Sequence, residues 1–398
     1  MSGRHVASKL ALVLTMGTLT LGVNGGTARA NPRGSGWSIQ PSPNPAGTIY
    51  ASLASVSCPG DGTCTAAGDY SPPSGGVVPL AEHYDGTTWS IQLPPVPAGA
   101  STSLLQSISC ATPQRCMAVG FSISGSLVSP LVEESNATTW KTLPTPRPPD
   151  AFWAELKSVS CTNLDCIAVG GFIKSGVDDQ EQPLSEGWNG RTWSLIPTLN
   201  PHAENGSGLD AVTCPSAGHC EAVGSYVFAD VIENVFAFGW DGTAWTFQPQ
   251  VNPGQGRVNA DYAVSCMGST SCTSVGTWND FEGRTRGLAE SWDGTSWTRQ
   301  PVGNPPGFQT LNLFGVSCSS PACEAVGDWS TSLNGLPAST LAERWDGTSW
   351  SIQPTPNPTG ARSSSLNAVA CSSSTACVAV GSSWDGSVTQ TLVETYSG

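Results

Sequence analysis

Basic residues are scarce in this 398-residue sequence. Lys and Arg number 16 against 30 Asp and Glu, which gives a formal net charge of −14. Nucleic acids and anionic membrane surfaces are recognised through basic patches, so this balance argues against both as partners. Charged residues of either sign make up only 12% of the chain, whereas Gly (45) and Pro (31) are abundant. Such a composition is not that of a helical protein.

Residue patterns typical of catalytic sites are also lacking. The chain has four His, and the three beyond the N-terminal segment, His83, His202 and His219, occupy unrelated positions. There is no G-x-S-x-G motif, no phosphate-binding loop and no pair of His at metal-binding spacing. The sequence therefore nominates no catalytic residue, no metal site and no cofactor.

A long apolar run is missing as well. The most apolar segment, residues 10–23, is too short for a comfortable membrane span. It follows Arg4 and Lys9 and precedes the small-residue motif Ala28-Arg29-Ala30, which is the pattern of a secretory signal peptide over residues 1–30. No Cys precedes Cys58, so a lipid-anchoring Cys is not expected. We predict a secreted, extracellular protein that is cleaved near Ala30–Asn31, without membrane insertion.

Cysteine, by contrast, is regularly placed. The 14 Cys form seven close pairs, and the first Cys of each pair follows the previous one after 51 to 53 residues. Zinc usually needs four ligands, but each repeat supplies two Cys and no recurring His. In an exported chain an even number of Cys favours disulfides. The predicted bonds are Cys58–Cys64, Cys110–Cys116, Cys161–Cys166, Cys214–Cys220, Cys266–Cys272, Cys318–Cys323 and Cys371–Cys377.

Each repeat follows one template. An alternating stretch such as LNAVAC (366–371) is followed by C-x-A-V-G, a variable segment, L-x-E-x-W, a tight turn, and W-x-x-Q-P. Every piece is short, alternates or is β-rich, and is bounded by Gly, Pro, Ser or Asn, which is typical of strands. Four strands in about 52 residues, repeated seven times, predict an all-β, seven-bladed β-propeller with four antiparallel strands and one disulfide per blade.

The chain ends predict how the ring closes. The last repeat stops after its third strand, at residues 392–398, and GWSIQP (36–41) supplies the missing fourth strand. We therefore expect a signal peptide (1–30) and a single propeller domain (31–398), with the N-terminal strand closing the last blade. The expected blades are 48–92, 100–143, 153–197, 207–249, 259–301, 311–354, and 364–398 together with 37–41.

The turn between the third and fourth strands is the most repetitive element. It reads WDGTAW at 240–245 and WDGTSW at 292–297 and 345–350, with WNGRTW at 188–193. Asp-Gly between strands favours a type I′ hairpin turn, in which both central residues have positive φ. A Trp on each arm predicts a cross-strand aromatic pair.

These Asp-Gly-Thr turns resemble the Asp-box of sialidase-like and other BNR-repeat propellers, although here Asp and Gly are adjacent and no Ser precedes the Asp at the expected spacing. Over residues 37–398 the repeat looks more like a family of secreted, uncharacterised bacterial propellers. The resemblance implies the fold and no particular activity. It does not extend to the sialidase mechanism, because the innermost strands carry no Arg.

One carboxylate recurs in six repeats at the third strand: Glu82, Glu133, Glu186, Glu290, Glu343 and Glu394. Paired carboxylates hydrolyse glycosides, which would make this series a catalytic ring. The alternative, which we favour, is that each Glu hydrogen-bonds backbone at a seam between blades.

Sequence variation gathers in the loops between second and third strands, at 72–76, 174–183, 227–236, 279–287 and 330–338, and we expect this face to bind the ligand. An aromatic residue follows the C-x-A-V-G glycine in each repeat. Exposed aromatic rings stack on sugars or peptide side chains; packing between blades is the alternative. Acidic loop residues Asp178, Asp179 and Glu181 suggest either a Ca²⁺ site or a solvated loop. The candidate ligand-binding residues are Tyr70, Phe172, Tyr226, Trp278, Trp329 and Trp384.

Three functions remain open from the sequence. The first is a secreted, non-enzymatic binding propeller, expected to be a monomer, whose partner is an extracellular glycan or protein. The second is an extracellular glycoside hydrolase or lyase of the Asp-box type, which would require two or more carboxylates to converge near the axis on the variable face; the candidates there are Asp69, Asp280 and Asp328. The third is a structural protein of the cell envelope.

Overall fold

The computed structural model describes residues 35–60, 62–163, 165–176, 180–201, 206–228, 232–253 and 258–398. These residues form 28 strands and no helix. The expected signal peptide, together with Asp178, Asp179 and His202, lies outside the described residues. Within the described ranges no helix is present that could cross a membrane. Residues 35–398 form one compact unit.

The first half of the chain contains strands β1 to β13. Their bounds are β1 (Gly36–Gln40), β2 (Ala51–Ser57), β3 (Cys64–Tyr70), β4 (Val78–Tyr84), β5 (Trp89–Gln92), β6 (Thr102–Thr112), β7 (Arg115–Ser124), β8 (Leu127–Ser135), β9 (Trp140–Thr142), β10 (Ala151–Thr162), β11 (Asp165–Lys174), β12 (Gln182–Trp188) and β13 (Trp193–Leu195).

The second half contains strands β14 to β28. Their bounds are β14 (Ser207–Ser216), β15 (His219–Phe228), β16 (Ile232–Trp240), β17 (Trp245–Pro249), β18 (Asn259–Gly268), β19 (Ser271–Asn279), β20 (Thr285–Trp292), β21 (Trp297–Arg299), β22 (Thr310–Ser319), β23 (Ala322–Ser330), β24 (Ser339–Trp345), β25 (Trp350–Gln353), β26 (Ser363–Ser373), β27 (Ala376–Trp384) and β28 (Thr389–Ser397).

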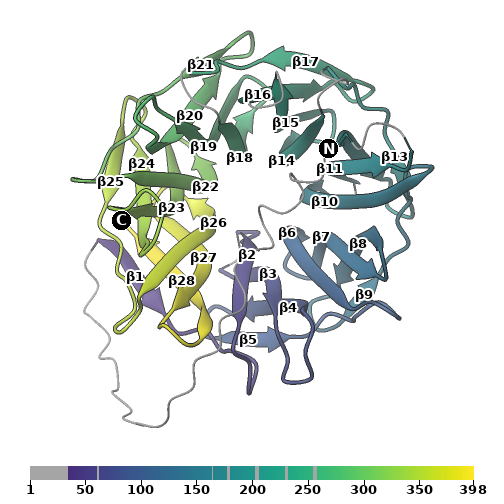
Figure 1. Ribbon diagram of the computed structural model, residues 1–398, viewed down its shortest axis with the longest axis horizontal. Coiled ribbons are helices and arrows are strands. Elements are labelled where there is room, and N and C mark those ends of the chain that lie inside the picture. Colours follow the sequence, from purple (N-terminus) through teal and green to yellow (C-terminus); the bar gives the residue numbers. More distant parts are fainter. Residues whose placement is uncertain are drawn as a thin grey trace. The chain divides into compact units, whose positions relative to one another are not determined.

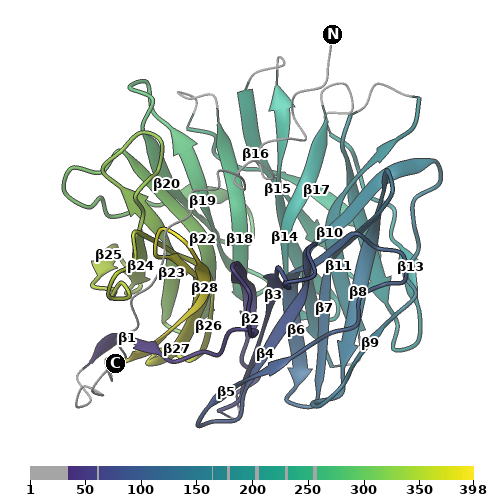
Figure 2. The ribbon, with the colours of Figure 1, turned by 60° about the horizontal axis from the view of Figure 1, so that its bottom comes forward.

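Consecutive strands pair antiparallel in four-stranded units, such as β2-β3-β4-β5 and β14-β15-β16-β17. Two larger sheets each consist of two such units, joined by one parallel residue pair, Trp153 with Val128 and Thr285 with Thr310. Figure 1 shows the units side by side around a common centre, with the first strand of each unit nearest that centre. Figure 2 shows the same strands standing roughly along the central axis.

Strand β1 pairs with β28, from the other end of the chain. The register runs from Gly36 opposite Ser397 to Gln40 opposite Val393, and the sheet order is β1-β28-β27-β26. Val380 and Val393 of this sheet share a buried core with Leu53 of β2. The first and last sheets are therefore packed against each other.

All seven predicted disulfides are present. Each joins the ends of the first and second strands of a unit, with Cα atoms 3.9 to 4.2 Å apart. No free cysteine occurs in the described part of the chain. Seven disulfides indicate an oxidising extracellular environment.

Each innermost strand contains a β-bulge two residues before the Val or Ile of its template. In β10, Leu156 pairs with Gly170 and Ser158 with Val169, so Lys157 is the extra residue. The facing glycine is required by close packing, since a Cβ on Gly170 would lie 2.1 Å from the carbonyl oxygen of Glu155. This explains the invariant Gly of the C-x-A-V-G segment.

The hairpin tips carry the predicted tryptophan pairs, but not the predicted turn. Trp292 lies opposite Trp297 with ring centroids 5.7 Å apart. Four residues separate them, and of these only Gly294 has a positive φ, so the type I′ prediction was wrong. The Asp293 carboxylate stabilises the loop instead, since Oδ1 accepts hydrogen bonds from the amides of Thr295 and Ser296, both at 2.8 Å.

Candidate functional site

Most of the candidate aromatic residues, which follow the template glycine of each repeat, pack inside the protein. Trp278 is only 9% exposed, and its indole N–H donates to the carbonyl of Gly287 at 3.2 Å. The guanidinium of Arg299 lies over its ring, 4.4 Å from the centroid. Four others are partly buried and pack against core clusters: Tyr70, Phe172, Tyr226 and Trp329. Their role in binding stays a prediction, and their rings already have protein neighbours.

Trp384 differs from the others, because 40% of it is exposed. The packed aromatics stand two residues past the template glycine, whereas Trp384 stands three residues past Gly381. Successive side chains of a strand point to opposite faces. The one-residue offset therefore places the indole on the other face of its strand.

The exposed indole borders a groove with a volume of about 490 Å³, which is within the usual size range of ligand sites. Three segments supply its lining. Leu336 and Pro337 come from the β23–β24 loop, Arg362 and Ser363 come from the start of β26, and Trp384 ends β27. The groove thus lies where two neighbouring four-stranded units meet.

Backbone hydrogen bonds fix these segments relative to one another. The amide of Arg362 donates to the carbonyl of Trp384 at 2.7 Å, and the amide of Ser364 donates to the carbonyl of Ala338 at 3.0 Å. The amide of Ala338 in turn donates to Ser363 Oγ at 3.1 Å. The groove is therefore preformed, which lowers the entropic cost of binding.

A cluster of charged side chains, separate from the groove, lies at the bulges near the centre of the ring. Lys157 Nζ lies 3.1 Å from Asp210 Oδ1, 3.2 Å from Glu181 Oε1 and 3.8 Å from Glu155 Oε1. Burial would lower the pKa of Lys157, but Asp210, Glu181 and Glu155 outweigh burial and raise it well above its usual value. The lysine therefore stays charged and neutralises part of a carboxylate cluster.

Glu181, one of the acidic loop residues, belongs to this cluster. A Cβ on Gly171 would lie 2.0 Å from Glu181 Oε1, and one on Gly208 would lie 2.5 Å from the same atom. The two glycines leave the space through which the carboxylate reaches Lys157. Among the described residues no group of three His, Cys, Asp or Glu could hold a metal ion; Asp178 and Asp179 lie outside them.

The bulge residues were missed as a set by the sequence reasoning. At this one template position the seven repeats carry Ala54, Gln106, Lys157, Asp210, Tyr262, Phe314 and Asn367. Several of them contact the neighbouring unit. Gln106 Nε2 donates to Glu155 at 3.2 Å, and Asn367 Nδ2 donates to the carbonyl of Leu53 at 2.9 Å. The sequence did contain a signal for these residues, because this position differs from repeat to repeat while the template positions around it recur.

The recurring third-strand glutamates are fully buried. The predicted backbone hydrogen bond at a seam between units is found for Glu343, and Glu186 has a side-chain partner at a seam, whereas Glu133 accepts a hydrogen bond from Thr142 of its own unit. The amide of Gly303 donates to Glu343 at 2.8 Å, and the Thr145 hydroxyl donates to Glu186. Burial raises the pKa of Glu186 to about 8 and that of Glu343 to about 7.

Two of the three carboxylates named for hydrolysis, Asp280 and Asp328, have partners within their own units. Asp280 forms an ion pair with Arg286 at 2.7 Å and accepts the amides of Glu282 and Arg284 in its own loop. Asp328 accepts a hydrogen bond from Asn312 Nδ2 at 2.8 Å, within its own unit. Burial raises the pKa of Asp69, in the first unit, to about 7.

No protein-family model and no curated protein matches the sequence. Solved structures do match the fold. An ulvan lyase, a polysaccharide lyase bound to -[GlcA(1-4)Rha3S]-, is 10% identical with a TM-score of 0.54, over 83% of this chain and 89% of its own. A protein of unknown function from Dyadobacter fermentans is 9% identical with a TM-score of 0.51, over 88% and 97%. YCF48 from Cyanidioschyzon merolae is 12% identical with a TM-score of 0.50, over 91% and 99%. At these identities the likeness shows the fold alone, which is of the β-propeller type.

Proposed function

We propose that this chain is a secreted, non-enzymatic binding protein that takes a carbohydrate ligand in the groove beside Trp384. The scaffold is a seven-bladed propeller whose last blade is completed by β1. The pairing of β1 with β28 and the sevenfold disulfide repeat support this architecture. The disulfides also support an extracellular location.

The exposed indole of Trp384 carries the proposal. A Trp that is 40% exposed at the edge of a groove offers an apolar face on which a sugar ring can stack, and its neighbours Leu336 and Pro337 extend that apolar surface. The groove is formed by a variable loop, the β23–β24 connection, and by the segment between two units. Variable loops on a rigid scaffold are where binding sites are commonly found.

A hydrolytic function has less support. Glycoside hydrolysis needs two carboxylates at a defined separation across the scissile bond. Asp280 and Asp328 have partners within their own units, and the recurring glutamates are buried at seams. No carboxylate belongs to the groove lining. Binding without catalysis is therefore the function we propose.

The test is a glycan-binding screen with the oxidised chain, residues 31–398. We expect at least one glycan to bind, and Trp384→Ala to weaken that binding by tenfold or more. Phe281→Ala is the matched control, since Phe281 is a more exposed aromatic, at 80%, outside the groove. Unchanged thermal unfolding must accompany both variants. A screen without a hit, or a hit that Trp384→Ala leaves intact, would refute the proposal.

A further inference from the structure

We infer, on the basis of the proposed function, that the groove selects an anionic saccharide, whose carboxylate or sulfate group is bound by Arg362. The inference adds a ligand class to the site and depends on the groove being a carbohydrate site. It rests on the position of the guanidinium, on the absence of a competing acid in the groove, and on the donors beside it.

The guanidinium of Arg362, which lines the groove, lies against the β27–β28 turn. A Cβ on Gly386 would lie 2.8 Å from Arg362 Nε and 2.9 Å from Cζ, so the guanidinium lies against a position where a side chain is missing. Gly386 also has a φ of 109°, a conformation that favours glycine. Gly386 thus allows both the backbone conformation of the turn and the close position of the Arg362 side chain.

The nearest acid along this turn is already engaged. Asp385 Oδ1 accepts hydrogen bonds from the amides of Ser387 and Val388, at 2.7 and 2.8 Å, and from the Ser387 hydroxyl at 2.8 Å. Backbone hydrogen bonds from Val388 and Ser387 lower the pKa of Asp385, so it stays ionised and committed to its turn. In the described part of the chain Arg362 forms no ion pair.

An exposed arginine without an acidic partner, at the edge of a preformed groove, fits a planar anion. Its fork of N–H donors matches a carboxylate or sulfate in two parallel hydrogen bonds. Ser363 Oγ accepts the amide of Ala338, which leaves the hydroxyl proton to donate to the ligand. Trp384 and Leu336 then supply the apolar surface for the ring that bears the anionic group.

The protein is acidic as a whole, so we expect an anionic ligand to be bound at Arg362 and not along the rest of the surface. The chain carries 30 acidic and 16 basic residues, so long polyanions are repelled by most of its surface. Binding should therefore depend on one or two anionic groups placed at Arg362. Its salt dependence should be shallow, equivalent to about one released counterion, unlike that of a polyanion-binding protein.

The test compares matched ligands by isothermal titration calorimetry at a fixed salt concentration. One pair is a tetragalacturonate and its methyl ester, in which a methyl group on each carboxylate removes the charge. The other pair is a sulfated galactose tetrasaccharide and its unsulfated form, so the two pairs separate a carboxylate ligand from a sulfate ligand. We expect at least one charged member to bind tenfold or more tightly than its neutral partner, and Arg362→Ala to abolish that preference. Arg191→Ala, at an exposed hairpin turn, should have no effect.

Arg362→Lys keeps the charge but loses the two-pronged donor geometry, so we expect it to restore part of the preference. Equal binding of charged and neutral members that Trp384→Ala weakens would overturn this inference and leave the proposed function standing. A charge preference that Arg362→Ala does not reduce would overturn it as well. Binding of none of the four ligands would overturn the inference for both anions, and the glycan screen would then decide the proposed function by itself.

Discussion

Lys157 Nζ lies 3.1 Å from Asp210 Oδ1, which joins the bulge residue of one four-stranded unit to the bulge residue of the next. Gln106, at the bulge of the preceding unit, reaches the same cluster through Glu155. Three adjacent units are thus connected near the centre of the ring by side chains from one template position. These polar contacts add to hydrophobic clusters that also combine neighbouring units, such as Val119 with Leu156 and Val169 with Leu209.

Replacing Lys157 by Met should destabilise the protein substantially. Met fills a similar volume but leaves Glu155, Glu181 and Asp210 without their cation, and uncompensated buried charges cost about 3–5 kcal/mol. Urea unfolding at pH 7 measures the effect. Lys141→Met is the control, because Lys141 pairs with Glu134 while its side chain is 67% exposed; an equal loss in both variants would contradict the argument.

The architecture of this cluster shows what the sequence predicts and what it does not. The strands, the disulfides and the Trp pairs follow from alternation and spacing, which are local properties. The position of the bulge does not, because the three-residue spacing of Leu and Val in L-x-x-V-x-C departs from strict alternation without showing which residue is the extra one. Only the pairing of Leu156 with Gly170 and of Ser158 with Val169 reveals that Lys157 is the extra residue.

Adding a methyl group at the template glycine should damage the bulge. In Gly276→Ala the new Cβ would lie 1.8 Å from the carbonyl oxygen of Ala260, a backbone atom that cannot move without disturbing the strand pair. Gly268 is the matched control in the same unit, since a Cβ there meets nothing within 4 Å and its φ is not positive. We expect a loss of about 2–3 kcal/mol, or misfolding, for Gly276→Ala and a change within about 0.5 kcal/mol for Gly268→Ala. Similar melting temperatures for the two variants would argue against this packing.

Buried glutamates should make the protein more stable in mild acid than in mild base. Burial raises the pKa of Glu82, Glu186 and Glu394 to about 8, and that of Glu133 and Glu343 to about 7. Between pH 4.5 and 8 the folded state therefore holds protons that the unfolded chain releases. Their contribution is fully present below the unfolded pKa and is lost as the pH rises through the folded pKa. The free energy of unfolding should fall from pH 5 to pH 8, by up to about 1.4 kcal/mol per pH unit for each group.

Urea titrations at several pH values test this slope. Glu394→Gln removes one of the titrating groups while keeping its size, so its slope should be smaller than that of the wild type. Glu282→Gln changes a carboxylate whose side chain is 64% exposed and should leave the slope unchanged. The turn aspartate Asp293 has its pKa lowered to about 2 because Thr295 and Ser296 donate hydrogen bonds to it; its contribution is lost as the pH falls through that value, outside this window. A free energy of unfolding that is flat or rises from pH 5 to pH 8 would show that these glutamates are ionised in the fold.

The candidate site was only partly predictable for a reason of geometry. The aromatic series was visible in the sequence, but the difference between buried Trp278 and exposed Trp384 depends on one residue of offset from the glycine. The groove also needs Leu336 and Arg362, which lie 48 and 22 residues before Trp384. Loops have no periodicity that would place them together, so their meeting is a property of the folded chain.

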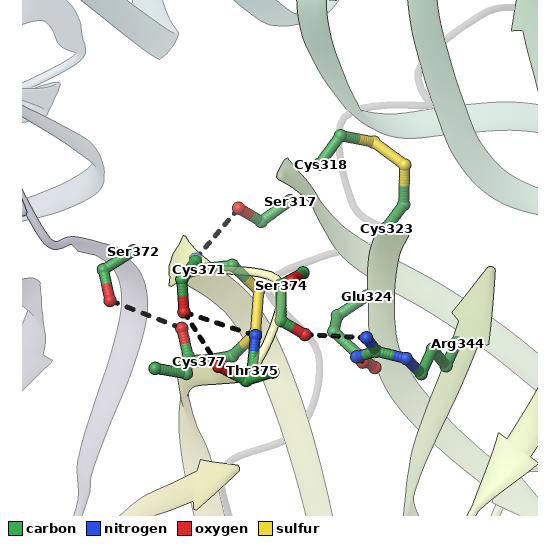
Figure 3. The surroundings of a disulfide bond; sticks show 12 residues. Ser317, Cys318, Cys323, Glu324, Arg344, Cys371, Ser372, Ser374, Thr375 and Cys377 are labelled. Carbon is green, nitrogen blue, oxygen red and sulfur yellow. Dashed lines mark hydrogen bonds and ion pairs between the residues drawn. A yellow bond between two sulfur atoms is a disulfide. The ribbon is translucent and has the colours of Figure 1, made fainter. Parts of the chain in front are cut away.

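The serine before the first Cys of a repeat should stabilise the contact between units. Ser317 Oγ accepts the amide of Cys371 at 3.0 Å, as Figure 3 shows, and Ser57, Ser109, Ser160 and Ser265 do the same for the next unit. Nearby, Arg344 bridges Glu324 of its own unit and the carbonyl of Ser374 in the next. Removing one such acceptor leaves a backbone N–H at the seam without its partner.

We therefore expect Ser317→Ala to cost about 1–2 kcal/mol, measured by urea unfolding of the oxidised protein. Ser351→Ala is the matched control, since that hydroxyl lies on the outermost strand β25, is exposed, and makes two long contacts of 3.4 Å, with the carbonyl of Arg344 and with Gln353 Nε2. The effect should persist when the disulfides are intact, because it concerns the contact between units and not the hairpin closed by Cys371 and Cys377. Faster amide exchange at Cys371 in Ser317→Ala, without a change at Cys318, would locate the lost bond; unchanged exchange at Cys371 would mean that the serine contributes nothing to this seam.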